Sequence, residues 1–241
     1  MELKSLLAQQ LLSAESWTDQ RKRDLVASVL LICPPDPDSH ATAINGIEAG
    51  RYRIDEKLLS DLYRAASNDI KIALVGTTAF TRLSPAVFER LFMQTWRIES
   101  MSLEQRETLV NSLSAFLLAR HPERAERFRD ILLEMLWSRN RYISLRGLGD
   151  VGFLSDLAPR DLDRLKRKAT AAFFGFRMNA FNALCHLVKR HREVSPEVLA
   201  FCTSKEIRAI ARRLNRTDPD KRVRTCAYYL LKALREYDRS R

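Results

Sequence analysis

The chain has 241 residues, of which 46% are hydrophobic and 29% charged, and its formal net charge is +11 at pH 7. That apolar content supports a sizeable core and excludes a chain that is disordered by composition. Seven glycines and eight prolines interrupt it, and the one proline-rich stretch, residues 33–40, is too short to separate independent domains. We therefore expect a single domain over residues 1–241.

The amino-terminal segment and the cysteines indicate a reduced, cytoplasmic protein. Gln9, Gln10 and Glu15 interrupt what would be the apolar core of a signal peptide. No window approaches the roughly 20 apolar residues of a membrane span, so no membrane association is expected. The cysteines lack the CxxC spacing of zinc and redox motifs and the framework of a small secreted protein. They are Cys33, Cys185, Cys202 and Cys226.

Apolar residues recur at helical spacing along almost the whole chain, with little strand-like alternation, which predicts an all-α fold. Helix starts are marked, in chain order, by Ser84–Pro85, by Ser102 with Gln105 three residues later, and by Ser195–Pro196. Each pattern offers a side-chain oxygen or a preset φ to a first helical turn. Helices are therefore expected to begin at these positions.

One helical pattern returns along the chain, most clearly in Phe176–Leu187 and Val223–Leu234. Both segments have an apolar residue followed by arginine, then a small residue at +4 and apolar residues at +7, +8 and +11. Weaker copies begin at Leu25, Ile72, Leu109 and Ile143. The starts lie 33 to 47 residues apart, a period typical of solenoids built from helical pairs. We expect an α-solenoid of about six antiparallel helix pairs.

Three segments resemble HEAT repeats, whose second helix typically carries an acidic turn, a Val-Arg-like pair, a small residue and then leucines. The closest match is Asp218–Leu234 (DPDKRVRTCAYYLLKAL), and Ser67–Phe80 and Phe173–Leu184 are weaker copies. The resemblance implies an irregular HEAT-like array. It also implies that Arg177 and Arg224 bridge to acidic residues of neighbouring repeats, which is the structural alternative to a contact with a ligand.

The whole positive excess lies in the last third of the chain. Residues 155–241 hold 21 Lys and Arg against ten Asp and Glu, whereas residues 1–154 hold 20 of each. A repeat scaffold with one basic end indicates a surface for a polyanion, most often nucleic acid. We expect the neutral part, residues 1–154, to be free to contact a protein partner.

The segment Thr203–Arg216 is the strongest candidate for a contact surface. Lys205, Arg208, Arg212 and Arg216 follow at helical steps and predict one solvent-facing ridge. Like charges stacked in this way repel unless an anion neutralises them, and arginine binds phosphate bidentately. An ordinary solvated face is the alternative. The remaining predicted nucleic-acid contacts are Lys166, Arg167, Lys168, Arg177, Arg190, Arg222 and Arg224.

Motifs for catalysis or metal binding are weak, and we expect no catalytic residue, no metal and no cofactor. The segment Gly147–Gly152 (GLGDVG) satisfies GxGxxG, but no buried strand precedes it, as a dinucleotide site requires. Gly147 instead fills the small-residue position of the repeat. Cys185, His186 and His191 lack the i, i+4 spacing of a helical ligand pair.

The chain also resembles, more weakly, the HEAT-like alkylpurine DNA glycosylases, which are compact solenoids with a basic concave face. The stretch RTCAYYLLKALREY looks like their last helices. Arg177 resembles the arginine that those enzymes place against the DNA backbone, and Tyr228 falls near a position where they use an aromatic residue. Their neighbouring tryptophans and catalytic aspartate have no clear counterparts here, Trp137 and Asp150 being the nearest substitutes.

The predicted function is non-enzymatic binding of nucleic acid, DNA first, through contacts between the basic carboxyl-terminal repeats and the phosphate backbone. Two alternatives stay open. One is a protein-interaction scaffold that docks an acidic partner, and the other is an alkylpurine-type DNA glycosylase.

Overall fold

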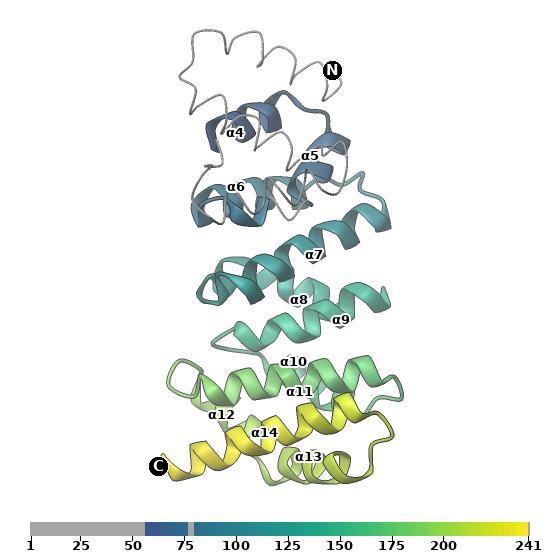
Figure 1. Ribbon diagram of the computed structural model, residues 1–241, viewed down its shortest axis with the longest axis vertical. Coiled ribbons are helices and arrows are strands. Elements are labelled where there is room, and N and C mark those ends of the chain that lie inside the picture. The colour runs from purple at the N-terminus through teal and green to yellow at the C-terminus, as the bar shows by residue number, and fades with distance from the viewer. Residues whose placement is uncertain (1–55, 77–79, 241) are drawn as a thin grey trace. The chain divides into compact units, whose positions relative to one another are not determined.

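The computed structural model describes residues 56–76 and 80–240, and no strand occurs among them (Figure 1). The chain divides into two compact units, Met1–Phe116 and Leu117–Arg241. The change from neutral to basic composition after residue 154 therefore falls inside the second unit. The repeat copy predicted at Leu25, the amino-terminal segment and Cys33 lie outside the described residues.

The described part of the first unit is helical. Its elements are α4 (Glu56–Ala65), α5 (Asn68–Val75), the short 3-10 helix η2 (Phe80–Arg82), α6 (Pro85–Trp96) and α7 (Leu103–Ala119), the last of which continues into the second unit. Helix α5 contacts both α4 and α6. On α6 and α7, the rings of Phe88 and Phe116 stack with their centroids 4.1 Å apart, and both side chains are fully buried. This part of the core is thus apolar and aromatic.

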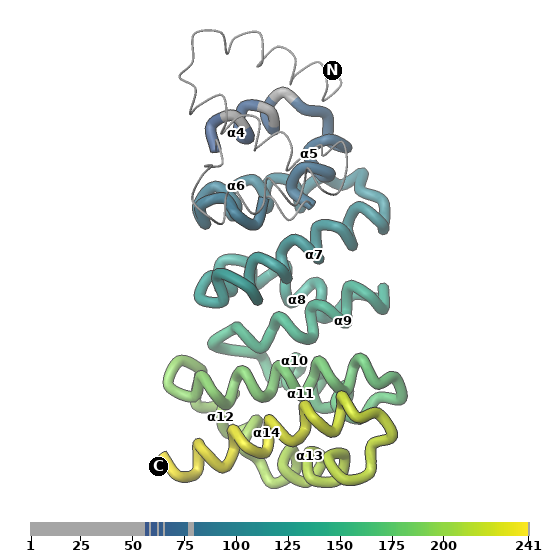
Figure 2. Tube along the Cα trace, viewed as in Figure 1, coloured from purple at the N-terminus to yellow at the C-terminus, as the bar shows by residue number. Residues whose placement is uncertain are grey.

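The second unit is built from helical pairs. Its elements are η3 (Pro122–Phe128), α8 (Arg129–Trp137), α9 (Arg141–Asp150), η4 (Val151–Phe153), α10 (Pro159–Ala169), α11 (Phe174–Lys189), α12 (Pro196–Cys202), α13 (Lys205–Thr217) and α14 (Lys221–Arg239). Helix α8 packs on α9, α10 on α11, and α13 on α14. Helix α11 also contacts α9 and α14, so that the second helices of the three pairs form one row (Figure 2). The paired helices predicted from the repeat are present here.

The predicted helix starts are confirmed. The Ser102 N–H donates to Gln105 Oε1 at 2.8 Å and the Gln105 N–H donates to Ser102 Oγ at 3.2 Å, which is a reciprocal capping box. Ser195 Oγ accepts from the Val198 N–H. Helix α6 begins at Pro85 as predicted, although its preceding Ser84 hydroxyl donates to a Glu56 carboxylate at 3.0 Å instead of capping the helix.

Gly147 allows two helices to approach closely. A Cβ at this position of α9 would lie 2.5 Å from the backbone nitrogen of Leu136 and 2.7 Å from the carbonyl carbon of Met135, both on α8. Ala180 and Ala227 fill the equivalent positions of α11 and α14 and are fully buried. The predicted small-residue position is therefore a packing requirement, and the GxGxxG motif runs from the end of α9 into η4 with no strand before it.

Replacing Gly147 with alanine is expected to lower the free energy of unfolding by about 1–3 kcal/mol, because the new methyl group meets backbone atoms of α8. Gly149→Ala is the matched control, since an added Cβ there has its nearest neighbours at 3.8 Å. The control should gain up to about 1 kcal/mol from higher helix propensity. Urea unfolding followed by circular dichroism measures both changes, and equal effects would contradict close packing at Gly147.

Candidate functional site

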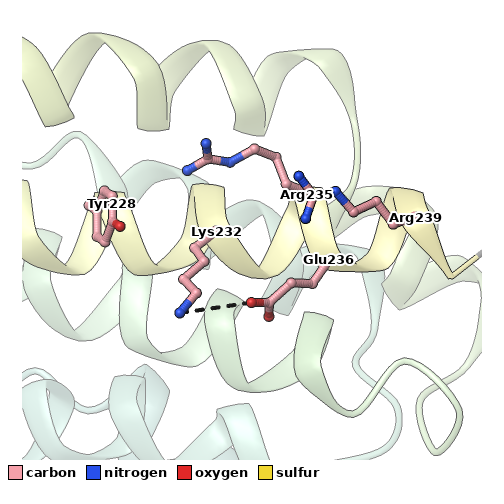
Figure 3. A pocket seen from close by; sticks show the side chains of 5 residues that line it. All are labelled: Tyr228, Lys232, Arg235, Glu236 and Arg239. Carbon is pink, nitrogen blue, oxygen red and sulfur yellow. Dashed lines mark ion pairs between the residues drawn. The ribbon is translucent and has the colours of Figure 1, made fainter.

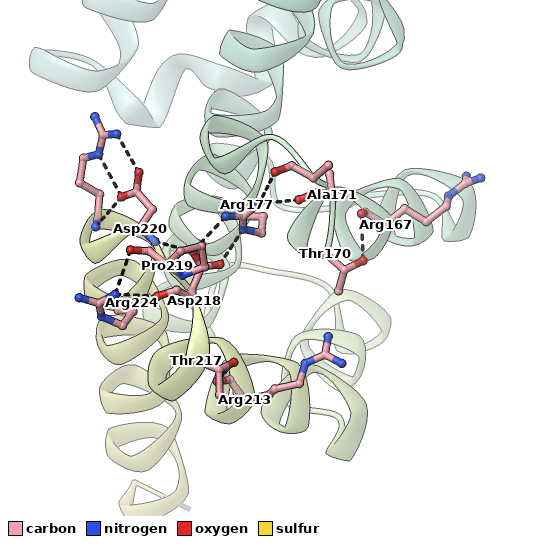
Figure 4. Close-up of polar contacts among 12 residues, drawn as sticks. Arg167, Thr170, Ala171, Arg177, Arg213, Thr217, Asp218, Pro219, Asp220 and Arg224 are labelled. Carbon is pink, nitrogen blue, oxygen red and sulfur yellow. Dashed lines mark hydrogen bonds and ion pairs between the residues drawn. The ribbon is translucent and has the colours of Figure 1, made fainter.

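Arg177 holds two neighbouring repeats together. Its Nε and Nη2 atoms donate to the carboxylate of Asp218 at 2.7 and 3.0 Å, and its Nη1 donates to the carbonyl oxygens of Ala171 and Ala172 at 2.8 and 2.6 Å (Figure 4). Arg177 is only 8% exposed and Asp218, in the turn before α14, only 3%. The bridge implied by the HEAT resemblance is confirmed for Arg177, whose guanidinium is used within the fold.

Two further predicted contacts are held by carboxylates of the chain. Both Nη atoms of Arg208 donate to Asp238 on α14, at 2.9 and 2.7 Å, and the Arg208 side chain is 19% exposed. Arg190 donates to Glu193 at 2.8 Å and to the carbonyl oxygen of Phe153. We predicted Arg208 on a solvent-facing ridge, but its side chain is mostly covered. Helix α14 packs along α13 and brings the Asp238 carboxylate to Arg208.

Charges on α10 are also compensated within the chain. Lys166 Nζ lies 3.6 Å from an Asp163 carboxylate oxygen and 3.3 Å from one of Glu206 on α13. Arg167 lies 3.3 Å from the other oxygen of Asp163 and is well exposed. Exposed pairs of this kind contribute about 0–1 kcal/mol, so they restrain these side chains only weakly.

Aromatic rings near the start of α11 are covered by cations. Lys168 Nζ lies 3.6 Å from the ring centroid of Phe176, and the guanidinium of Arg222 lies 4.2 Å from that of Phe174. Burial lowers the pKa of Lys168. Arg222 also donates to Asp220 at 3.1 and 2.8 Å, and these hydrogen bonds hold the Asp220 pKa at about 2. The charge on Arg222 is thus compensated, and the two rings already have cationic partners.

Apart from Arg208, Arg222 and Lys232, which pair with Asp238, Asp220 and Glu236, the cations of α13 and α14 have no carboxylate partner in the part of the chain that the structure describes. They form what we call the C-terminal basic surface, which consists of Lys205, Arg212, Arg213, Arg216, Lys221, Arg224, Arg235 and Arg239. All are exposed except Arg224, which is partly buried. Four of them, Lys205, Arg212, Arg216 and Arg224, were among the predicted contacts. The other four were not among the predicted contacts, although the helical spacing of Arg235 and Arg239 on α14 could have revealed those two.

Two exposed tyrosines lie within this surface. Tyr228 lines one hollow with Lys232, Arg235, Glu236 and Arg239 along α14 (Figure 3). Tyr228 also lines a second hollow, between α13 and α14. The other lining residues are Asn215 of α13 and Lys221, Arg224, Thr225 and Tyr229 of α14. Tyr228 and Tyr229 are 48% and 51% exposed. Tyrosine and arginine are enriched at protein interfaces, and here they occur side by side.

Of the two residues nearest to a glycosylase constellation, Trp137 makes structural contacts and Asp150 is buried. The Trp137 indole N–H donates to Asp161 at 2.6 Å, and the guanidinium of Arg164 lies 4.4 Å from the Trp137 ring centroid. Asp150 is 2% exposed at the end of α9. The glycosylase resemblance therefore receives no support from these residues.

The histidines near Cys185 make separate ring contacts. His186 packs against Phe153 with the ring centroids 4.8 Å apart, and His191 packs against Tyr237 at 5.4 Å. Within residues 56–76 and 80–240, no group of three or more His, Cys, Asp or Glu side chains is arranged to hold a metal ion.

The described cysteines, Cys185, Cys202 and Cys226, are free thiols. Burial raises the pKa of Cys202 to about 12, which makes its thiol a poor nucleophile. None of the helices that the structure describes is both long and apolar enough to cross a membrane.

Comparisons with known proteins show the fold. No protein-family model matches the chain, and no curated protein matches it. An engineered protein of known crystal structure is similar, with 12% sequence identity and a TM-score of 0.55 over 98% of both chains. A designed armadillo repeat protein in complex with the peptide (KR)4 is 12% identical, with a TM-score of 0.55 over 97% of this chain and 100% of that one. A second designed armadillo repeat protein is 14% identical with a TM-score of 0.53, over the same shares. The fold is therefore an all-α helical-repeat solenoid, as predicted.

Asp218→Ala is expected to lower the free energy of unfolding by about 3–5 kcal/mol, because it leaves the Arg177 charge buried without its counterion. Asp238→Ala removes the more exposed partner of Arg208 and should cost no more than about 1 kcal/mol. Urea unfolding of the two variants makes the comparison. Similar losses would show that the Arg177–Asp218 pair has no special place in the fold.

Proposed function

We propose that this protein is a non-catalytic helical-repeat binding module that docks an acidic segment of a partner protein on its C-terminal basic surface. The observation that carries the proposal is the gathering of cations without carboxylate partners in the described residues, around Tyr228 and Tyr229 on α14. Other basic residues of the second unit, such as Arg177 and Arg208, already hold carboxylates.

Electrostatics gives the surface a reason to bind an anion. On α13, Arg212 and Arg216 lie one helical turn apart with no counterion among the described residues, so their charges repel. An acidic segment relieves that repulsion and is steered toward the surface by its field. The exposed tyrosines add contact area with a polar tip, which suits a protein ligand.

The fold is compatible with this function. A solenoid offers long side-by-side helices, and the designed armadillo repeat protein described above is in complex with a basic peptide, (KR)4. On this chain the charges without a partner among the described residues are positive, so a negatively charged ligand is favoured instead of a basic one. The neutral residues 1–154 leave room for a second protein contact elsewhere.

A second candidate function is binding to the backbone of nucleic acid, DNA first. It is favoured by the size of the positive excess, since all of the +11 lies within residues 155–241. The exposed pairs at Lys166 and Arg167 are weak enough for phosphates to replace their carboxylates. Recognition would then depend on backbone and shape rather than on base edges.

Fluorescence anisotropy can separate the two candidates. The ligands are a short aspartate-rich peptide, its asparagine counterpart, duplex DNA and single-stranded RNA, each measured over a salt series. We expect the aspartate peptide to bind, the asparagine peptide to fail, and the triple variant Arg212→Glu, Arg216→Glu, Arg235→Glu to lose at least about tenfold in affinity, or ~1.4 kcal/mol.

The control variant Arg90→Glu, Arg97→Glu changes exposed arginines of the neutral part and should bind as the unaltered protein does. Tight, steeply salt-dependent binding of duplex or RNA with no binding of the aspartate peptide would select the second candidate. Absence of binding to every ligand at low salt would overturn both.

A further inference from the structure

Arg224 repeats the local geometry of Arg177 one repeat later. Its Nη1 donates to the carbonyl oxygens of Asp218 at 2.6 Å and Pro219 at 3.2 Å, which precede it by six and five residues. The same Nη1 atom of Arg177 donates to the residues six and five positions before it, Ala171 and Ala172 (Figure 4). The turn before each helix therefore fixes the guanidinium in the same way.

The two arginines differ on the opposite edge of the guanidinium. In Arg177, Nε and Nη2 hold the carboxylate of Asp218. In Arg224, Nε and Nη2 have no carboxylate partner among the residues that the structure describes. Arg224 also lines the hollow that contains Lys221 and Tyr228, so it is accessible from that hollow.

We infer that Arg224 is the anchor point of the acidic partner, and that its free edge takes one aspartate or glutamate carboxylate of that partner through two parallel hydrogen bonds. This inference rests on the proposed function and identifies Arg224 as the residue that binds the partner most specifically. The planar guanidinium fork matches a carboxylate, and the arginine is already oriented by its turn, so little side-chain entropy is lost on binding. Lys221 adds a second positive charge beside the incoming carboxylate.

The neighbouring residues favour a protein carboxylate over a nucleic-acid backbone. On α14, Glu236 lies among Lys232, Arg235 and Arg239, and its carboxylate is 3.9 Å from Lys232 (Figure 3). A chain of phosphates bound along these cations would therefore meet a negative charge. A protein segment can place a cation or a neutral group there and still present a carboxylate to Arg224. Like-charge contacts of this kind discriminate between partners.

The test follows the side-chain Nε–Hε signals of the whole protein by NMR while the aspartate-rich peptide is added. The Arg224 signal, assigned by comparison with Arg224→Lys, should shift with the peptide and stay unchanged with the asparagine peptide. The Arg177 signal should not move, because its partners lie within the fold. The titration itself uses the unaltered protein, and the variant serves only to assign the Arg224 signal.

Affinities of matched variants complete the test. Arg224→Lys keeps the charge but loses the fork, and should weaken binding of the aspartate peptide about tenfold, whereas Arg235→Lys makes the same change nearby and should weaken it less than about threefold. Equal small effects, or a stationary Arg224 signal while other surface signals move, would overturn the anchor and leave the proposed function standing. Peptide binding that is absent altogether would defeat the proposed function itself.

Discussion

The ion pair between Arg177 and Asp218 is the contact on which the organisation of the second unit depends. Burying a guanidinium and a carboxylate is costly unless their hydrogen bonds are satisfied, and here Arg177 donates to two carboxylate oxygens and two carbonyl oxygens. These bonds tie the turn before α11 to the turn before α14. They fix how one helical pair sits on the next, while apolar burial supplies most of the stability.

Packing of the pairs also decides which charges stay available. Where one helix lies along another, arginines are within reach of carboxylates on the neighbour, as Arg208 is of Asp238. Arg212, Arg216 and Arg239 reach no carboxylate among the described residues, although Glu236 on the same face of the molecule pairs with Lys232, so their charges stay uncompensated. The basic surface thus follows from the basic composition of α13 and α14 combined with the lack of carboxylate partners for these cations among the described residues.

The sequence was sufficient for the fold class and for several local features, because these depend on spacing alone. The repeat identified the helices that carry Arg177 and Arg224, Ser102 with Gln105 identified a capping box, and Gly147 identified a close helix contact. The resemblance to HEAT repeats implied a bridge from Arg177 to an acidic residue, but the other ion pairs could not be foreseen in the same way. Asp238 follows Arg208 by 30 residues on another helix, and only the register of α14 on α13 brings them together. Helical spacing along α13 therefore predicted four cations on one ridge, whereas the structure leaves only Lys205, Arg212 and Arg216 without a carboxylate partner among the described residues.

Arg224 differs from its basic neighbours because the fold already orients its guanidinium. Arg235 and Arg239 lie on an exposed face of α14, where Arg235 Nε donates one hydrogen bond, to the Leu231 carbonyl oxygen at 3.3 Å. An anion that binds them must still order long exposed side chains and gains little beyond a screened charge contact. Arg224 is partly buried and already bonded to two carbonyl oxygens, so the ordering has been done by the fold. A carboxylate that reaches it gains two charge-assisted hydrogen bonds in a less hydrated site, where they are stronger. In the proposed complex, the diffuse charge of the surface governs encounter with the partner, and the oriented arginine governs which partner stays bound.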